Sequence, residues 1–555
     1  MQALSDMDSA TNKTRTDKLI YFICILCLFI TGIRWASGLE NHVDLLLADE
    51  AEYLRNGLNL FHVIAKNWGP TYNLWYKALS YINSNPVELY YLNYKIGAIG
   101  VGILLFVFLV RYQIHIAVAF LISFCFLFSD VNINVWPRIS NFVIIVLLLF
   151  FIAVKNMSSI LNKLILFATI CFVLAFARPE LLSIAMLLSV ISISCSLYNY
   201  KKIKSHFPYL LLLFVVAGVL FFVYGKPADS YSNINRIYIA FCQHYAIAYR
   251  IRMHSSINAV IEWIDFTRPL FGDCKTVPEI FMKHFDLVWP HVLFTTKLYI
   301  TTFLGYVLNF VVPVYSIHKT KLRIAILIGL LFFIVYSFYN KKIRLLIITK
   351  IKEHSIVLLF SFIVSIPSIG ICAIIFPRQH YMMMQCIWIA LLLGIILSAW
   401  LEVIDFKSYY LLPLIIFSFC ISPKATEFTT LQSVADIKNL CMQKFVRFVN
   451  EQKWTKQHTI FSNILNIQML FNEPEKFDQF NTEYMLKQMP LNTQFADILK
   501  DHKIDIIFMN DALAEETRLK KDTAWQQLVA HPEKYNFKKI EYCKDCESYL
   551  LVKDF

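Results

Sequence analysis

The sequence predicts a polytopic α-helical membrane protein that continues into a soluble α/β domain. Of its 555 residues, 57% are hydrophobic and only 16% are charged, whereas soluble domains carry roughly 45–50% apolar and about 25% charged residues. The apolar residues gather in runs that, with their flanks, approach the ~20 residues of a spanning helix. From residue 423 the composition becomes mixed and polar. We therefore expect about 11–13 spans in residues 1–422 and a separate domain in residues 423–555.

Basic residues account for the net charge of +13, and most of them lie between the apolar runs. The clearest groups are Lys201, Lys202 and Lys204, then Lys319, Lys321 and Arg323, then five lysines and arginines within residues 341–352. Short basic loops flanking spans follow the positive-inside rule. The positive-inside pattern therefore explains the net charge, and no nucleic-acid partner is expected. The same bias places the N-terminus in the cytoplasm and predicts large outer loops at residues 39–86 and 225–291.

The first apolar run, residues 19–33, is interpreted as an uncleaved helix rather than a signal peptide, because Arg34 and Trp35 suit a membrane-interface anchor. The loop after it contains a helix-like segment at 53–64 and an aromatic stretch at 68–81. Further spans are expected at 91–110, 116–128 and 139–154, then one on each side of Arg178-Pro179-Glu180, and then at 207–224. The later candidates are 292–317, 324–339, 356–376, 381–400 and 409–422. If all of these cross, the C-terminal domain is cytoplasmic; if one does not, it lies outside.

The C-terminal domain is predicted to be α/β from its local patterns. Residues 504–510 and 548–553 are typical of short strands, and residues around 493–499 and 523–530 of helices. Cys543 and Cys546 form a Cys-x-x-Cys motif. If the domain lies outside the cytoplasm, the simplest interpretation of this motif is a local disulfide. A metal or redox site is the alternative.

Asp49 and Glu50 are adjacent carboxylates just after the first span. A carboxylate in this position suits a general base that takes a proton from an acceptor hydroxyl. The pair could equally bind a divalent cation, which is the one cofactor that the sequence suggests. The structural alternative is an N-terminal helix cap with Glu52 three residues on.

Two further outer segments carry candidate residues. Asp130 and Arg138 lie in a short outer loop, where the acid could join Asp49 and the arginine could meet an anion. Between two late apolar runs stands Pro377-Arg378-Gln379-His380-Tyr381, in which a guanidinium can hold a phosphate bidentately. The structural alternatives are an ordinary polar loop and a snorkelling arginine with an interface tyrosine.

Two other features are less specific. Arg178-Pro179-Glu180 forms a charged break between spans, which could orient the outer loops through a local ion pair or form an ordinary hairpin turn. The loop 225–291 contains donors such as His244 and Arg250, which could bind a sugar or pyrophosphate, but no spacing among them is diagnostic.

In their order along the chain these motifs resemble the GT-C superfamily of membrane glycosyltransferases. The residues that carry the resemblance are Asp49-Glu50-Ala51-x-Tyr53, Gly69-Pro70, Arg178-Pro179-Glu180 and Pro377-Arg378-x-His380-Tyr381. The sequence is most similar to the bacterial branch related to protein O-mannosyltransferases and lipid A aminoarabinose transferases. The resemblance covers roughly residues 15–420.

The resemblance implies an inverting enzyme of the bacterial inner membrane, with its active site on the periplasmic face. A polyprenyl-phosphate sugar would be the donor, and a hydroxyl or amine of a lipid, glycan or protein the acceptor. Asp49 would be the base beside Glu50, and Asp130 the second-loop acid. Arg378, with His380, would bind the lipid phosphate, and Tyr381 and Arg138 would add contacts.

The family likeness further implies an outer C-terminal domain and one non-spanning segment between residues 292 and 339. The competing hypotheses are a transporter or flippase and a non-catalytic protein of surface-polysaccharide assembly. A transporter would place charges within the spans. Here the charges lie at the span ends and in the outer loops.

Overall fold

The computed structural model describes residues 2–60, 69–133, 136–198, 203–227, 236–257, 259, 262–312, 320–426, 439–486, 489–490 and 493–553. Within these ranges, the side chains of residues 2–17, 48, 203, 236, 320–323, 483, 484 and 517 are not among those described. Several predicted features therefore lie outside the described residues: Trp68, the basic residues Lys201, Lys202 and Lys319, and parts of the segments 53–64, 225–291 and 292–317.

Helices form nearly the whole of the first 421 residues. Those of the first half are α1 (Gln2–Ala36), η1 (Leu39–Asn41), α2 (Ala48–Leu58), α3 (Pro70–Ser80), α4 (Pro86–Arg111), α5 (Ile116–Leu127), α6 (Ile139–Val154), α7 (Ile160–Ala175), η2 (Pro179–Leu181), α8 (Leu182–Tyr198) and α9 (Ile203–Tyr224). They are followed by α10 (Arg236–Met253), α11 (Trp263–Phe271), α12 (Val277–Lys283), α13 (Phe285–Leu308), α14 (Thr320–Tyr339), α15 (Lys341–Glu353), α16 (Ser355–Ile374), α17 (Gln379–Met382), η5 (Met383–Gln385), α18 (Cys386–Val403), η6 (Ser408–Tyr410) and α19 (Leu411–Ile421).

Six of these helices are long and apolar enough to cross a membrane: α1 from Lys18, α4, α8 with η2, α9, α16, and α18 with the turns before it. A seventh candidate is the pair α14 and α15, which is bent by 94°. Four shorter apolar helices, α5, α6, α7 and α19, bring the apolar segments to eleven. The count of 11–13 spans therefore stays a prediction, because its lower bound requires the short helices to cross as well.

The C-terminal part is a five-stranded mixed sheet with helices around it. Its elements are α21 (Cys441–Glu451), β1 (His458–Ser462), η8 (Ile467–Leu470), η9 (Pro474–Lys476), β2 (Phe477–Asn481), η10 (Thr482–Leu486), α22 (Phe495–Asp501), β3 (Ile504–Met509), α23 (Asp511–Ala514), α24 (Thr517–Lys520), α25 (Thr523–Ala530), η11 (Pro532–Tyr535), β4 (Phe537–Ile540) and β5 (Tyr549–Lys553). The strand order is β2-β1-β3-β5-β4, with β1 parallel to β2 and β3, and β5 antiparallel to β3 and β4. The two predicted strands and two predicted helices are confirmed, whereas β1, β2 and β4 were not predicted.

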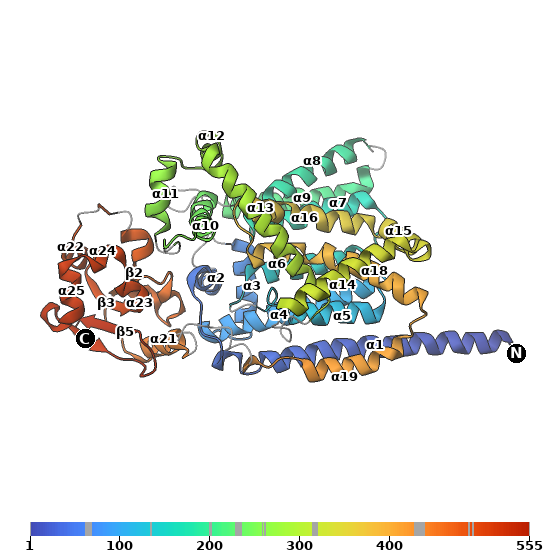
Figure 1. Ribbon diagram of the computed structural model, residues 1–555, viewed down its shortest axis with the longest axis horizontal. Coiled ribbons are helices and arrows are strands. Elements are labelled where there is room, and N and C mark those ends of the chain that lie inside the picture. The colour runs from blue at the N-terminus through green and yellow to red at the C-terminus, as the bar shows by residue number, and fades with distance from the viewer. Residues whose placement is uncertain are drawn as a thin grey trace.

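The helical bundle has two distinct ends. Figure 1 shows the N-terminus at one end and the C-terminal sheet at the other, next to α2, α3 and α10–α12. We call the second the domain end. The first loop and the C-terminal domain thus share one end, as expected, while the membrane face that they occupy stays a prediction.

One helix between residues 292 and 339 does not run along the bundle. In Figure 1, α13 crosses the bundle obliquely, whereas α14 runs on to the end remote from the sheet. Leu308 and Asn309, at the end of α13, share a cavity with Asp130. Near the end of α14, Ser337 accepts a hydrogen bond from Trp400 Nε1 at 2.6 Å. Which segment between residues 292 and 339 does not span, and on which face the C-terminal domain lies, therefore stay predictions.

The first loop holds the C-terminal domain in place by capping one of its helices. The carboxylate of Asp44, which is buried, accepts hydrogen bonds from the backbone N–H groups of Met442 and Gln443, each at 2.9 Å. These groups belong to the first turn of α21, whose N–H groups have no partner within the helix. Gln443 Nε2 also donates to Tyr91 Oη at 2.6 Å. The two parts are joined by buried polar contacts as well as by packing.

The predicted disulfide between Cys543 and Cys546 is wrong. Cys546 is bonded to Cys441 instead, with their Cα atoms 5.8 Å apart, and Cys543 is a free thiol 3.3 Å from Lys444 Nζ. The partner lies 105 residues away in sequence. The fold brings the start of α21 to the turn before β5, where Asn439 Nδ2 donates to the carbonyl of Asp545 at 2.5 Å. No local spacing could indicate this pairing, although a stable disulfide fits the expected outer location.

Replacing Cys546 by serine is expected to destabilise the C-terminal domain by about 2–5 kcal/mol, because the bond closes a long loop of the unfolded chain. The measurement is the rate of proteolysis of the domain in the purified protein. Cys543→Ser is the matched control and should leave that rate unchanged. Equal sensitivity of both variants would contradict the pairing with Cys441.

Candidate functional site

Glu50 lies in a closed polar cage between α2, α3 and α4. Its side chain is only 5% exposed. One carboxylate oxygen accepts hydrogen bonds from Tyr72 Oη at 2.6 Å, from Tyr76 Oη, and from Asn93 Nδ2 at 3.1 Å. Asn93 in turn accepts from Trp75 Nε1 at 2.8 Å. The aromatic stretch predicted in the first loop therefore encloses this carboxylate, and Glu50 acts as an internal anchor of the loop.

Burial raises the pKa of Glu50 to about 8, against the opposing effect of the hydrogen bonds from Tyr72 and Tyr76. A carboxyl whose pKa is raised on folding stabilises the folded state at low pH, and this stabilisation is lost as pH rises through the folded pKa. We expect the temperature midpoint of unfolding to decrease as the pH is raised from about 5 to about 9. Glu50→Gln should remove most of this pH dependence. Glu451→Gln, at an exposed position on α21, is the control and should keep the wild-type profile. A wild-type midpoint that rises over this range would contradict the cage.

Asp49 points in a different direction from Glu50. Successive residues of an α-helix are rotated by about 100°, so the adjacent carboxylates do not share one face, and Asp49 is only partly buried. Asp49 and Tyr53 are one turn apart on α2. Tyr53 lies close enough to Arg178 to influence the pKa of its guanidinium. The face of α2 that carries Asp49 is therefore turned toward the arginines described below.

Gly69 makes the close approach of the first loop possible. It has φ +49°, and a Cβ atom there would lie 2.7 Å from Tyr53 Cε1 and 3.1 Å from Ile139 Cδ1. Only glycine tolerates both this backbone conformation and this contact. The Gly69-Pro70 motif thus brings α2 and α3 against the start of α6, where Arg138 stands.

Arg138 is a largely buried cation whose hydrogen-bonding capacity is not used. Its Nε and Nη1 atoms are buried and have no hydrogen-bond partner. Its guanidinium lies over the ring of Trp136 at 4.7 Å. Burial lowers the pKa of Arg138 to about 10, with the positive charges of Arg378 and Arg178 acting in the same direction, so it stays charged at neutral pH. Buried donors without a partner are costly.

Arg178 and Arg378 lie close enough to Arg138 for their charges to act on it. Arg178 is buried, pairs with Glu180 at 2.5 Å and stands over the ring of Tyr381 at 5.1 Å. Arg378 is exposed. The turn that carries Arg378 is held against α6 by a hydrogen bond from Ser140 Oγ to the carbonyl of His380 at 2.9 Å.

Two histidines complete a cationic cluster, which we define as Arg138, Arg178, Arg378, His244 and His380. The charges of all three arginines reach His380. His244 stacks on Phe376 at 5.8 Å, and its Nε2 atom is buried without a partner. Burial lowers the pKa of His244 to about 4, with Arg378 adding to the effect, so His244 is neutral. Four segments predicted separately thus meet at one place.

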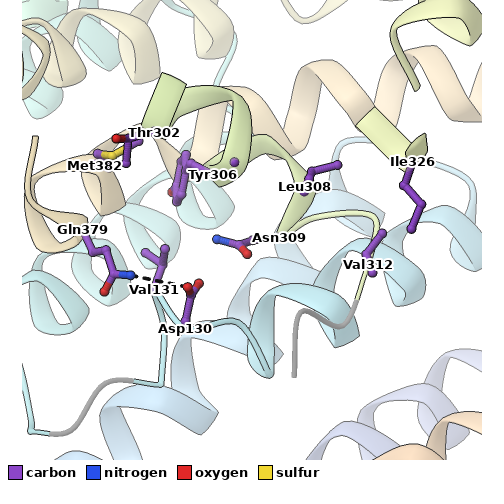
Figure 2. A pocket seen from close by; sticks show the side chains of 11 residues that line it. Asp130, Val131, Thr302, Tyr306, Leu308, Asn309, Val312, Ile326, Gln379 and Met382 are labelled. Atoms are coloured by element: carbon purple, nitrogen blue, oxygen red, sulfur yellow. Dashed lines mark hydrogen bonds between the residues drawn. The ribbon is translucent and has the colours of Figure 1, made fainter. Parts of the chain in front are cut away.

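Asp130 lies beside this cluster and lines a cavity of about 190 Å³. Gln379 Nε2 donates to Asp130 Oδ2 at 3.4 Å. Figure 2 shows Asp130, Gln379 and Asn309 gathered on one side of the cavity, while Val312 and Ile326 lie toward the far end. The cavity therefore has a polar part at Asp130, Asn309 and Gln379, the residue after Arg378, and an apolar part at Val312 and Ile326.

The fold brings most of the predicted site residues to one place. Asp130, Arg138, Arg378, His380 and Tyr381 meet there. Asp49 is one helical turn from Tyr53, which lies near Arg178, and Glu50 is turned away into its own cage. Among the described residues no group of three or more His, Cys, Asp and Glu side chains is placed to hold a metal ion, and Asp49 and Glu50 do not present two carboxylates to one cation.

Some functional groups were not predicted from the sequence. The cage residues Tyr72, Tyr76 and Asn93 were missed, although two tyrosines four residues apart indicate one face of a helix. Arg178 was expected in a local ion pair or a hairpin turn; the ion pair with Glu180 is present, but its place beside Arg138 and Arg378 was not predicted.

No known family model matches the sequence, and a search of curated protein sequences finds no match. The resemblance to the GT-C superfamily therefore stays a prediction.

Proposed function

We propose that the protein is an integral-membrane glycosyltransferase that transfers a sugar from a polyprenyl-phosphate donor to a hydroxyl or amine acceptor. The cationic cluster is the observation that carries this proposal. Three arginines gather at one end of an apolar helical bundle, and one of them, Arg138, holds buried donors with no partner. A phosphate group satisfies such donors with strong charge-assisted hydrogen bonds.

The cavity next to the cluster supports a lipid-linked donor rather than free phosphate. It is polar at Asp130 and Gln379 and apolar at Val312 and Ile326. A phosphate at Arg378 would leave the first isoprene units facing apolar side chains. A bundle with six helices of spanning length and composition offers the matching environment for the rest of the chain.

The reaction that fits these groups is a single inverting displacement. Asp49 takes the proton of the acceptor hydroxyl or amine as the acceptor atom bonds to the sugar's anomeric carbon. The bond from that carbon to the phosphate oxygen breaks on the opposite face, and polyprenyl phosphate leaves. Negative charge grows on the phosphate during this step, and the cationic cluster stabilises it. Glu50 positions α2 from its cage and takes no part in the proton transfer.

The test uses the purified protein in liposomes with a polyprenyl-phosphate sugar labelled in the sugar. Release of polyprenyl phosphate together with label on an added membrane-extract acceptor supports the proposal. Movement of intact donor across the bilayer without cleavage would overturn it in favour of a flippase. Failure of polyprenyl phosphate to compete for the donor site, with polyprenol as the uncharged comparison, would also overturn it.

A further inference from the structure

Three cysteines of the C-terminal domain lie at one place, although only two of them are bonded. Cys441, the first residue of α21, is bonded to Cys546. Cys543 is a free thiol and is partly exposed. The proposed glycosyl transfer does not use this thiol, so its place beside a disulfide needs an explanation of its own.

A turn brings Cys543 within bonding reach of Cys546. Lys544 and Asp545 form this turn, and the two cysteines stand at its ends. The Cα atoms at the two ends of a β-turn are less than about 7 Å apart, and disulfides join Cα atoms about 4.4–6.8 Å apart. The backbone therefore permits the local bond that the Cys-x-x-Cys motif predicts, even though Cys546 is bonded to Cys441.

The first turn of α21 carries both the partner of Cys546 and a contact for Cys543. Lys444 lies three residues after Cys441, and residues with this spacing are neighbours on a helix surface. Its Nζ atom is 3.3 Å from Cys543 Sγ. The three sulfur atoms are thus gathered at the start of α21.

α21 reaches this position by docking rather than by its own sequence. Asp44 of the first loop accepts a hydrogen bond from the N–H group of Met442 at 2.9 Å. On the other side of the helix, Phe445 packs on Phe508 of β3, with ring centroids 4.6 Å apart. Cys441 is held beside Cys546 only once these long-range contacts have formed.

The two possible bonds of Cys546 differ in the length of chain that they close. Cys543 is three residues away in sequence, and Cys441 is 105 residues away. Closing a short loop costs less conformational entropy than closing a long one. Oxidation before α21 has docked therefore favours the bond to Cys543. After docking, the bond to Cys441 no longer requires the long loop to be closed.

We propose that Cys543 is a transfer thiol, through which the Cys441–Cys546 disulfide forms in two steps. First, Cys543 and Cys546 lose two electrons and two protons to an external disulfide of the glutathione class, which is reduced to two thiols. Next, the Cys441 thiolate attacks Cys546 Sγ, the Cys543–Cys546 bond breaks, and Cys543 leaves as a thiolate. The leaving thiolate takes up a proton from solvent in place of the one that Cys441 released, so this exchange involves no net oxidation.

The exchange accounts for the free thiol of the folded protein. Cys543 is released when Cys441 takes its place, and Lys444 of the docked helix then contacts its sulfur. The final disulfide forms only after α21 has docked on the first loop. The inference does not depend on the proposed glycosyl transfer.

The first test asks whether the local bond can form. The full-length Cys441→Ser variant in nanodiscs is treated with oxidised glutathione, quenched with acid and alkylated. Non-reducing peptide mass mapping should show Cys543 and Cys546 bonded to each other and lost to alkylation. In the double variant Cys441→Ser/Cys543→Ser, the matched control, Cys546 should carry glutathione or the alkyl label. If both thiols of the single variant carry only these groups, the inference is overturned.

The second test follows the order of the bonds in the full-length chain, in metabolically labelled cells whose thiols are trapped with acid at successive times. The Cys543–Cys546 bond should appear first and decline as the Cys441–Cys546 bond rises. Cys543→Ser should slow formation of the Cys441–Cys546 bond about tenfold or more, because the short loop is no longer closed first. Cys420→Ser, at an exposed free cysteine of α19, is the control and should keep the wild-type rate.

A transfer thiol and a structural thiol predict different results. A transfer thiol affects only the rate, so Cys543→Ser should reach the wild-type midpoint of thermal unfolding once the Cys441–Cys546 bond has formed. A lower midpoint would show that Cys543 is structural and would overturn the inference. Formation of the Cys441–Cys546 bond at the wild-type rate in Cys543→Ser would overturn it as well.

Discussion

Replacing Arg138 and Arg378 together by glutamine is expected to weaken binding of a polyprenyl-phosphate donor by about 100-fold or more. A hydrogen bond to a charged group contributes about 1.5–3 kcal/mol, and the double variant removes two charged donors. Arg138 is expected to dominate because its Nε and Nη1 atoms are buried and unpartnered. Arg378 is exposed, and solvent screens its charge.

The measurement is competition of unlabelled polyprenyl phosphate against a fluorescent donor analogue bound to the purified protein. Arg447→Gln, at an exposed position on α21, is the control and should bind like the wild type. Polyprenol should bind weakly to all variants alike, because it lacks the phosphate. Donor affinity that is unchanged in the double variant would remove the basis of the proposed phosphate site.

The second large effect is expected at Asp49. Asp49→Asn keeps the size of the side chain but cannot take a proton, so transfer should fall by about 10²–10⁴-fold, the usual contribution of a general base. Donor affinity should stay within about twofold of the wild type, since Asp49 lies on α2 and the phosphate ligands on other segments. Single-turnover transfer with preloaded donor separates the chemical step from binding.

Two comparisons decide the assignment of the base. Asp273→Asn, an exposed carboxylate in the loop after α11, is the control and should transfer normally. Asp130→Asn tests the other candidate acid, which lines the cavity with Gln379. If Asp49→Asn transferred sugar at the wild-type rate while Asp130→Asn did not, the base would be Asp130.

Local patterns predicted the parts of the fold that depend on local forces. Apolar runs predicted the helices of the bundle, and short apolar runs in 504–510 and 548–553 predicted β3 and β5. β1 was missed, because its sequence His458–Ser462 has two adjacent apolar residues between polar ones and lacks the alternation typical of a strand. Such short strands gain their stability from neighbours across the sheet, and their own sequence carries a weak signal.

In the candidate site, too, local patterns predicted some features and the folded structure decided the others. Asp49 and Glu50 were equivalent as a sequence pair. The folded structure separates them, because adjacent residues on a helix face different surroundings. Glu50 meets Tyr72, Tyr76 and Asn93, whereas Asp49 faces the side of Arg178. A role for each carboxylate can therefore be argued only from its neighbours.

The sequence by itself determined that this is a many-helix apolar protein with a mixed α/β domain after residue 422, because hydropathy and periodicity are properties of neighbouring residues. It also indicated which turns carry charge. Only the tertiary structure decided that Arg138, Arg178 and Arg378 meet, that Cys441 rather than Cys543 pairs with Cys546, and that η8 of the C-terminal domain packs on α2. Each of these joins residues far apart in the chain, and such contacts are set by packing of the whole fold.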